Sequence, residues 1–170
     1  VSVDANSGNL KGSSDDESVA IDSFQFDWDG IPCSKVDLTL SQKNKPLNIP
    51  NNTSFRVCHE VTIKSGTTFI VQPGAKVEIA SGGSIVVESG ATVNINEGIV
   101  NIAAGGTITN ELGGTIRNKG TITNDGTITN ENGGTISNKG TITNNGTITN
   151  ELGGTITNDG TITNKNLIRN

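Results

Sequence analysis

The stretch GTITNDGTITNENGGTISNKGTITNNGTITNELGGTITNDGTITN, residues 120–164, decides the fold of this chain. Glycine recurs every six to eight residues, and the Thr-Ile-Thr triplets between the glycines are β-branched, so the stretch favours strands over a helix. The units continue on both sides, and their central isoleucines are Ile108, Ile116, Ile122, Ile128, Ile136, Ile142, Ile148, Ile156, Ile162 and Ile168. Their spacings run 8, 6 and 6 and then repeat, which superposes a 20-residue period on the shorter one.

A period of this length is typical of a solenoid, in which each repeat stacks on its neighbours. Three units per period predict an all-β, three-sided parallel β-solenoid (a β-helix) of about 20 residues per coil, in which the isoleucines stack in three columns. Because side chains alternate along a strand, an inward isoleucine places both flanking threonines outward. Glycine before each strand and asparagine at its end fall at or near the corners, where we expect them to supply backbone conformations that other residues resist.

An asparagine follows each isoleucine at the second position. We expect side-chain amides stacked about 4.8 Å apart to hydrogen-bond along a column, as they do in cross-β structures. The members of this predicted ladder are Asn110, Asn118, Asn124, Asn130, Asn138, Asn144, Asn150, Asn158 and Asn164. A polar binding row is the alternative, but a ladder is favoured because the pattern serves all three corners alike.

Every third corner contains two extra residues and places Glu111, Glu131 and Glu151 in one column. These carboxylates could suggest calcium, which usually takes six or more oxygen ligands, but the column supplies no others. We therefore expect solvated glutamates, no metal and no cofactor.

Upstream, TTFIVQPGAKVEIASGGSIVVESGATVNINEG, residues 67–98, consists of eight-residue units with two alternating aliphatic residues in most strands. This pattern predicts wider and better packed coils. We place irregular coils at residues 55–107 and regular coils at 108–170, about five coils in all.

The amino-terminal part divides into an acidic arm at residues 1–20 and a β cap at 21–54. In the cap, Phe24, Phe26 and Trp28 alternate with polar residues, which predicts an amphipathic strand that covers the first coil. Cys33 and Cys58 predict one disulfide in an exported protein.

Two other interpretations of the cysteines stay open. They could be free thiols of a cytosolic protein, or Cys58 could bind a metal with His59 and Glu60. The metal site is the weaker alternative, because adjacent strand residues point to opposite faces.

Composition narrows the function classes. Of the 170 residues 31% are hydrophobic and 3% aromatic, and the net charge is −5. A stripe of Lys and Arg with interleaved aromatic residues would predict nucleic-acid binding, and this sequence contains no such stripe. No apolar run approaches the roughly 18 residues of a membrane span. We expect a secreted, extracellular or cell-surface protein whose chain has been processed before Val1. Sequence motifs for glycans occur at Asn51, Asn52 and Asn145.

At the carboxyl-terminal end the isoleucine and asparagine registers continue, but Leu167 and Arg169 replace the flanking threonines. An uncapped coil presents unpaired backbone groups to another chain. We therefore expect these residues to take part in assembly with the cap or arm of another copy.

The segment GTITNNGTITNELGGTITNDG, residues 140–160, resembles the low-complexity β-solenoid segments of secreted prokaryotic surface proteins, especially archaeal ones. That resemblance implies a stalk, an adhesin rod or a filament subunit, without catalytic residues. The six-residue units also resemble the hexapeptide repeat of left-handed β-helices. Acyltransferases with that fold use a histidine between subunits, whereas His59 precedes the repeats, so we expect no enzyme.

The threonine columns resemble the ice-binding face of insect antifreeze β-helices. One such array consists of Thr121, Thr123, Thr141, Thr143, Thr161 and Thr163. Against ice binding, Thr-Ile-Thr occurs on all three faces, and threonine is simply a good outward strand residue.

Three functions follow from these patterns. The first is a structural subunit of an extracellular filament that assembles head to tail with copies of itself. The alternatives are an ice-binding solenoid and the rod segment of a cell-surface adhesin.

Overall fold

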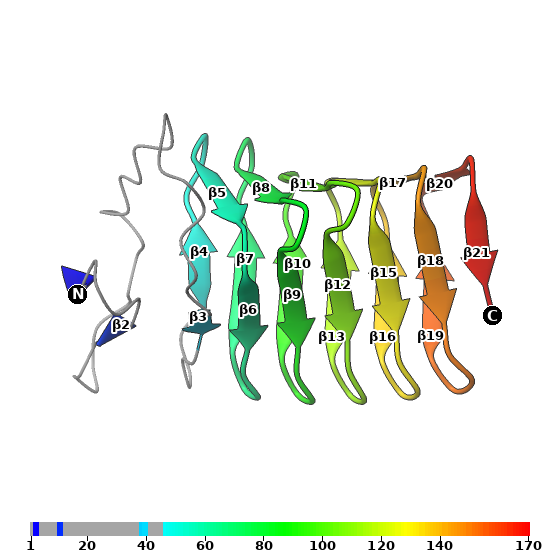
Figure 1. The fold of residues 1–170 in the computed structure, drawn as a ribbon, viewed down its shortest axis with the longest axis horizontal. Coiled ribbons are helices and arrows are strands. Elements are labelled where there is room, and N and C mark those ends of the chain that lie inside the picture. Colours follow the sequence, from blue (N-terminus) through cyan, green and yellow to red (C-terminus); the bar gives the residue numbers. More distant parts are fainter. Residues whose placement is uncertain (1, 4–9, 12–37, 41–45) are drawn as a thin grey trace.

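The computed structural model describes residues 2–3, 10–11, 38–40 and 46–170, and these residues form strands without a helix (Figure 1). Strands β1 (Ser2–Val3) and β2 (Leu10–Lys11) make a short antiparallel pair. All other strands belong to three parallel sheets. No helix among the described residues is long and apolar enough to cross a membrane.

Every third strand along the chain belongs to the same sheet. Sheet 1 contains β4 (Leu47–Ile49), β7 (Thr68–Val71), β10 (Thr92–Ile95), β13 (Thr115–Asn118), β16 (Thr135–Asn138) and β19 (Thr155–Asn158). Sheet 2 contains β5 (Ser54–Val57), β8 (Lys76–Ile79), β11 (Ile99–Ile102), β14 (Thr121–Asn124), β17 (Thr141–Asn144) and β20 (Thr161–Asn164). Sheet 3 contains β3 (Leu38–Leu40), β6 (Glu60–Ile63), β9 (Ser84–Val87), β12 (Thr107–Asn110), β15 (Thr127–Asn130), β18 (Thr147–Asn150) and β21 (Leu167–Arg169).

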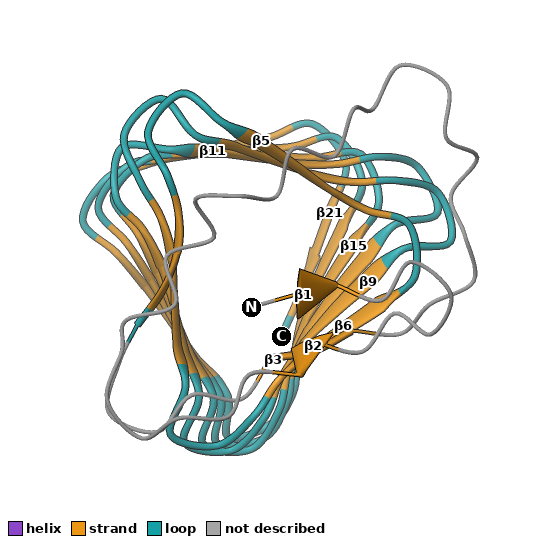
Figure 2. Cartoon of the chain, turned by 90° about the vertical axis from the view of Figure 1, so that its left-hand side faces the viewer, coloured by secondary structure: helices purple, strands orange, loops and turns teal. Residues whose placement is uncertain are grey.

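Viewed along the stack, the three sheets form the sides of a roughly triangular coil (Figure 2). The predicted three-sided parallel β-solenoid is therefore confirmed. Its sheets contain six, six and seven strands, so the stack has about six turns instead of the five expected. The sheets also begin upstream of residue 55, because β3 and β4 pair with β6 and β7.

The register of the downstream coils follows the isoleucine spacing. Ile108 pairs with Ile128, which pairs with Ile148, so that successive members of the column are separated by one period of the sequence repeat. Upstream the coils are longer, since Ile108 pairs with Ile85, which pairs with Val61, and both separations exceed that period.

The corners explain this difference in coil length. Upstream, Gln72–Ala75 joins β7 to β8 with four residues, whereas downstream Lys119–Gly120 joins β13 to β14 with two. The downstream glycines lie against one another, and a Cβ on Gly140 would be 2.1 Å from the carbonyl oxygen of Gly120. Glycine is therefore required at these short corners by close backbone approach.

In the downstream coils, positive φ angles occur at the four-residue corners and not at the two-residue corners. In the four-residue downstream corners Gly113, Gly133 and Gly153 have φ of 76°, 75° and 89°. Among the described non-glycine residues, only Asn52 and Glu97 have positive φ. The expectation that the repeat asparagines supply backbone conformations that other residues resist is therefore wrong: they are the last residues of regular strands.

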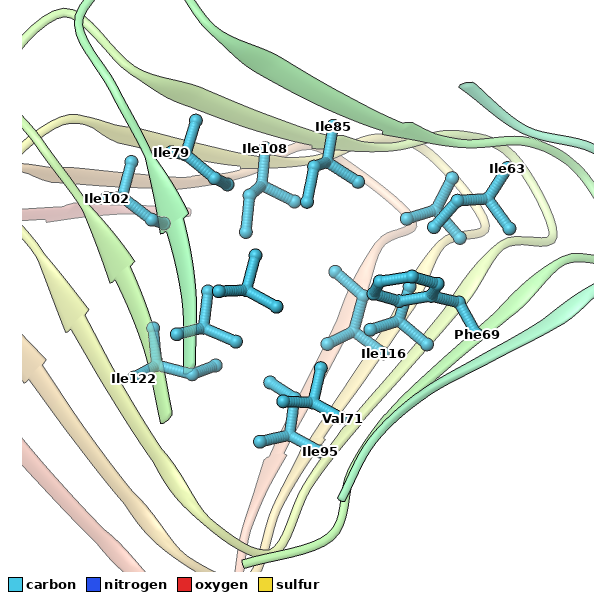
Figure 3. Packing of buried hydrophobic residues seen from close by; sticks show 14 of the residues in the cluster. Ile63, Phe69, Val71, Ile79, Ile85, Ile95, Ile102, Ile108, Ile116 and Ile122 are labelled. Carbon is cyan, nitrogen blue, oxygen red and sulfur yellow. The ribbon is translucent and has the colours of Figure 1, made fainter. Parts of the chain in front are cut away.

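The core also changes along the stack. Most upstream strands bury two apolar side chains each, such as Val77 and Ile79 in β8, and these side chains converge from the three sheets (Figure 3). Downstream strands keep the first of these inward positions as isoleucine and use asparagine at the second, as Ile122 and Asn124 do in β14.

Candidate functional site

The asparagine columns are hydrogen-bonded ladders. In sheet 3, Asn110 Nδ2 donates to Asn130 Oδ1 at 2.7 Å, and Asn130 Nδ2 donates to Asn150 Oδ1 at 2.8 Å. The other two sheets contain the same contact, from Asn118 through Asn138 to Asn158 and from Asn124 through Asn144 to Asn164. Six of these side chains, in Asn110, Asn118, Asn124, Asn130, Asn138 and Asn144, are fully buried.

Most of the ladder amides also donate to a backbone carbonyl of their own corner. Asn138 Nδ2 donates to the carbonyl of Gly140 at 3.2 Å, and Asn144 Nδ2 donates to that of Gly146 at 3.1 Å. At the longer corner the acceptor is four residues away, where Asn130 Nδ2 contacts the Gly134 carbonyl at 3.1 Å. One side chain thus joins a local turn to the next coil, which gives a buried amide the partners it needs.

The ladders have a direction, which the sequence did not reveal. In every bond between rungs the donor Nδ2 belongs to the earlier coil, so the first rungs present Oδ1 to the aliphatic coil before them. Asn110 stacks on Val87 and Asn124 on Ile102, and neither Oδ1 has a hydrogen-bond partner among the described residues. Asn118 differs, because its Oδ1 accepts from the backbone N–H of Gly120 at 3.0 Å.

In the part of the chain that the structure describes, the coil formed by β19, β20 and β21 has a neighbouring coil on one side only. Strands β19, β20 and β21 each lie at the end of a sheet, and the side chains of Ile156 and Ile162 are only partly buried there. Ile168, in the corresponding position of β21, is 38% exposed. This surface, which we call the terminal face, combines unpaired strand edges with apolar side chains.

The asparagines of the terminal face accept a hydrogen bond from the preceding coil, but their own amide groups donate only to local carbonyls. Asn158 Nδ2 donates to the Gly160 carbonyl at 3.1 Å, and Asn164 Nδ2 donates to that of Asn166 at 3.2 Å. Each therefore has a second amide proton directed to where another coil would add. Leu167 is half-buried and Arg169 exposed beside them.

The outward threonines form parallel arrays. In sheet 2, Thr121 and Thr123 pair with Thr141 and Thr143, which pair in turn with Thr161 and Thr163. Sheet 3 contains an equivalent array, and in sheet 1 Arg117 and Ser137 interrupt it. The threonines therefore cover more than one face.

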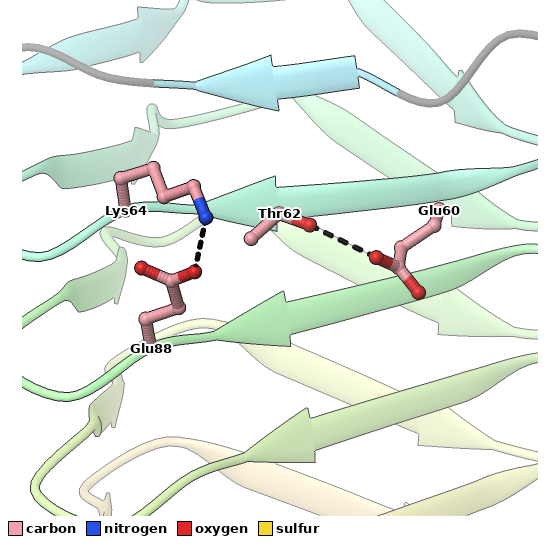
Figure 4. Close-up of polar contacts among 4 residues, drawn as sticks. All are labelled: Glu60, Thr62, Lys64 and Glu88. Atoms are coloured by element: carbon pink, nitrogen blue, oxygen red, sulfur yellow. Dashed lines mark hydrogen bonds and ion pairs between the residues drawn. The ribbon is translucent and has the colours of Figure 1, made fainter.

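Charged contacts belong mainly to the upstream coils. Lys64 forms an ion pair with Glu88 of the adjacent coil beside sheet 3, and the Thr62 hydroxyl donates to Glu60 at 3.0 Å (Figure 4). In the part of the chain that the structure describes, no cluster of His, Cys, Asp and Glu side chains could hold a metal. That part includes the column of Glu111, Glu131 and Glu151, and also His59 with Glu60.

The predicted glycan positions lie at corners. Asn51 and Asn52 are exposed between β4 and β5, and Asn145 is exposed between β17 and β18. Asn145 Nδ2 donates to Asp125 Oδ1 at 2.8 Å. Glycosylation at all three remains a prediction.

Several predicted residues lie outside the described residues, namely Phe24, Phe26, Trp28 and Cys33. The amphipathic cap and the disulfide between Cys33 and Cys58 therefore stay predictions. Cys58 itself lies directly after β5 and is partly buried.

Comparison with known proteins adds little. No protein-family model and no curated protein matches the chain. One solved structure, "Crystal structure of TibC-catalyzed hyper-glycosylated TibA55-350 fragment", is similar over 79% of this chain, with 16% identity and a TM-score of 0.32. The match covers 55% of that fragment. A likeness this weak carries no functional argument.

Proposed function

We propose that the protein is a structural subunit of an extracellular filament or surface fibre, which assembles head to tail with other copies of itself. The observation that carries the proposal is the terminal face, where Ile156, Ile162 and Ile168 are less buried than their column neighbours. An exposed strand edge beside apolar side chains is a template for pairing with another chain.

Ladder polarity supports a head-to-tail contact. If two terminal faces met, the amide donors of Asn158 and Asn164 would confront the same donors of the partner. A symmetric contact of this kind leaves polar groups unsatisfied, which is costly. A contact between different ends does not close on itself and therefore generates a filament.

The amino-terminal segment would supply the other side of this contact. In the proposal, Phe24, Phe26 and Trp28 form the cap, the Cys33–Cys58 disulfide fixes it, and residues 1–20 reach the next copy. A fibre subunit needs no catalytic or cofactor site, so the protein would be no enzyme.

A charge on the terminal face tests the proposal. Ile162→Lys places an ammonium group among the inward side chains of the last coil, whereas the control Thr163→Lys places it on the outward side of the same strand. We expect filaments in electron micrographs of the wild type and of Thr163→Lys, and their loss in Ile162→Lys. Monodisperse particles of the wild-type protein at all concentrations would contradict the proposal and favour an adhesin rod.

The in-register threonine pairs of sheet 2 favour ice binding as a second candidate. Its test is thermal hysteresis of the wild type against Thr143→Lys, which disrupts the centre of the array. Absence of thermal hysteresis and of recrystallisation inhibition at high concentration would remove this candidate.

A further inference from the structure

The inward side chains of the three sheets leave a cavity of about 240 Å³ along the axis of the stack. Its wall extends from Phe69 and Val77 in upstream coils to Ile156, Ile162 and Ile168 in the last. Apart from two asparagines, the side chains that line the cavity are aliphatic, with the one aromatic ring of Phe69. Figure 3 shows such side chains converging from the three sheets between Ile63 and Ile122.

The cavity is long and narrow. Phe69 and Ile156 belong to one column of sheet 1, in which β7, β10, β13, β16 and β19 follow one another. Four steps of about 4.8 Å give a length of about 19 Å. A volume of about 240 Å³ over that length has room for a single file of methylene groups and none for a globular molecule.

The wall determines which occupant is favoured. Water needs two to four polar partners, but the ladder amides lie at the corners and already contact carbonyl groups. Empty apolar cavities stay dry and bind apolar guests. The polar side chains that line the cavity are Asn158 and Asn170, both in the last coil.

We propose that the axial cavity binds the unbranched alkyl tail of a single-chain amphiphile, which enters at the terminal face. Its carboxylate or hydroxyl head group stays at the mouth and accepts a hydrogen bond from the side-chain amide of Asn158 or Asn170. Only one proton of the Asn158 amide is used by the Gly160 carbonyl, so the other can donate to the ligand. The proposal does not rest on the proposed fibre, but a bound amphiphile and another copy would compete for the terminal face.

Fluorescence titration with all-trans-parinaric acid, a straight polyene fatty acid, tests the proposal on the intact chain. Ile156→Phe fills the mouth with a larger side chain at a partly buried position, and the column already contains Phe69 upstream. Its matched control, Thr157→Phe, places the same ring on the outward side of β19. We expect saturable one-to-one binding to the wild type and the control, and about tenfold weaker binding to Ile156→Phe, a change of about 1.4 kcal/mol.

Competition with wild-type protein gives a second test that needs no variant. Hexadecanoic acid should displace the probe, whereas adamantane-1-carboxylic acid, which has the same head group on a globular cage, should not. Equal binding to wild type and Ile156→Phe, equal displacement by both acids, or no saturable binding would each overturn the proposal.

Discussion

The coils before residue 107 and the coils after it differ in their inward side chains and in their length. Upstream, most strands bury two apolar side chains, and the coils are longer than the downstream repeat, as the pairings of Val77 with Phe55 and of Ile85 with Val61 show. Downstream, the second inward position is asparagine and each coil matches the shorter repeat of the sequence. The amide closes a two-residue corner and bonds to the next coil, so a chain poor in apolar residues can still stack.

The largest expected effect concerns the short downstream corners. Gly140→Ala places a Cβ 2.1 Å from the backbone oxygen of Gly120, which only movement of the coil can relieve. We expect the free energy of unfolding, measured in denaturant, to fall by about 3 kcal/mol. Gly66→Ala is the upstream control: its Cβ meets nothing within 4 Å, and the cost of its left-handed conformation is about 1 kcal/mol. Equal losses would show that crowding does not distinguish the two regions.

The next largest effect is expected when an inward side chain of the upstream type replaces an asparagine of the downstream coils. Asn130→Val introduces the upstream residue type, but it removes the acceptor of Asn110 and leaves Asn150 Oδ1 without its donor. We expect a loss of about 2 kcal/mol in the free energy of unfolding. A stability equal to or above wild type would mean that the ladder contributes little beyond occupying space.

A smaller effect is expected where the two regions meet. Asn110→Val removes a rung whose Oδ1 already lacks a partner, and the new side chain would pack on Val87. In the variant, Asn130 Oδ1 instead of Asn110 Oδ1 lacks a donor, so the number of unpartnered oxygens is unchanged. The net loss is mainly the bonds from Asn110 Nδ2 to the Gly114 and Thr135 carbonyls, about 1 kcal/mol in all. A loss larger than that of Asn130→Val in the same denaturation experiment would contradict this account of ladder polarity.

The smallest effect belongs to the upstream surface. The Lys64 and Glu88 side chains are 44% and 26% exposed, so Lys64→Ala should cost only about 0.5 kcal/mol. The difference from wild type should vanish in about 1 M salt, where charges are screened within about 3 Å. If it survives in salt, packing of the lysine stem is responsible instead of charge.

Much of the downstream fold could be predicted because one signal repeats. The isoleucine spacing predicted three parallel columns, and the longer period predicted their register before any packing was known. The upstream boundary was missed, since Pro50 and the turn that follows it separate two short strands whose alternation is too brief to recognise.

The details that depend on three dimensions were not predictable. Glycine at position 140 is explained by the carbonyl of Gly120 in the preceding coil, and conformational preference alone pointed to the wrong cause. The direction of the ladders depends on which way each amide is turned. At most rungs, such as Asn138 and Asn144, Nδ2 also bonds to the carbonyl of its own corner, and this contact is visible only in three dimensions.

Hydrogen exchange of the asparagine side-chain amides, followed by NMR at low and high protein concentration, tests the central claim most directly. Inner rungs such as Asn130 and Asn144 should be protected at both concentrations, because they are buried and bonded to the next coil. Asn158 and Asn164 should exchange rapidly when dilute and become protected when copies assemble. Exchange of the inner rungs as fast as that of Asn164 would contradict the ladder, and an unprotected Asn164 within assembled filaments would contradict contact through the terminal face.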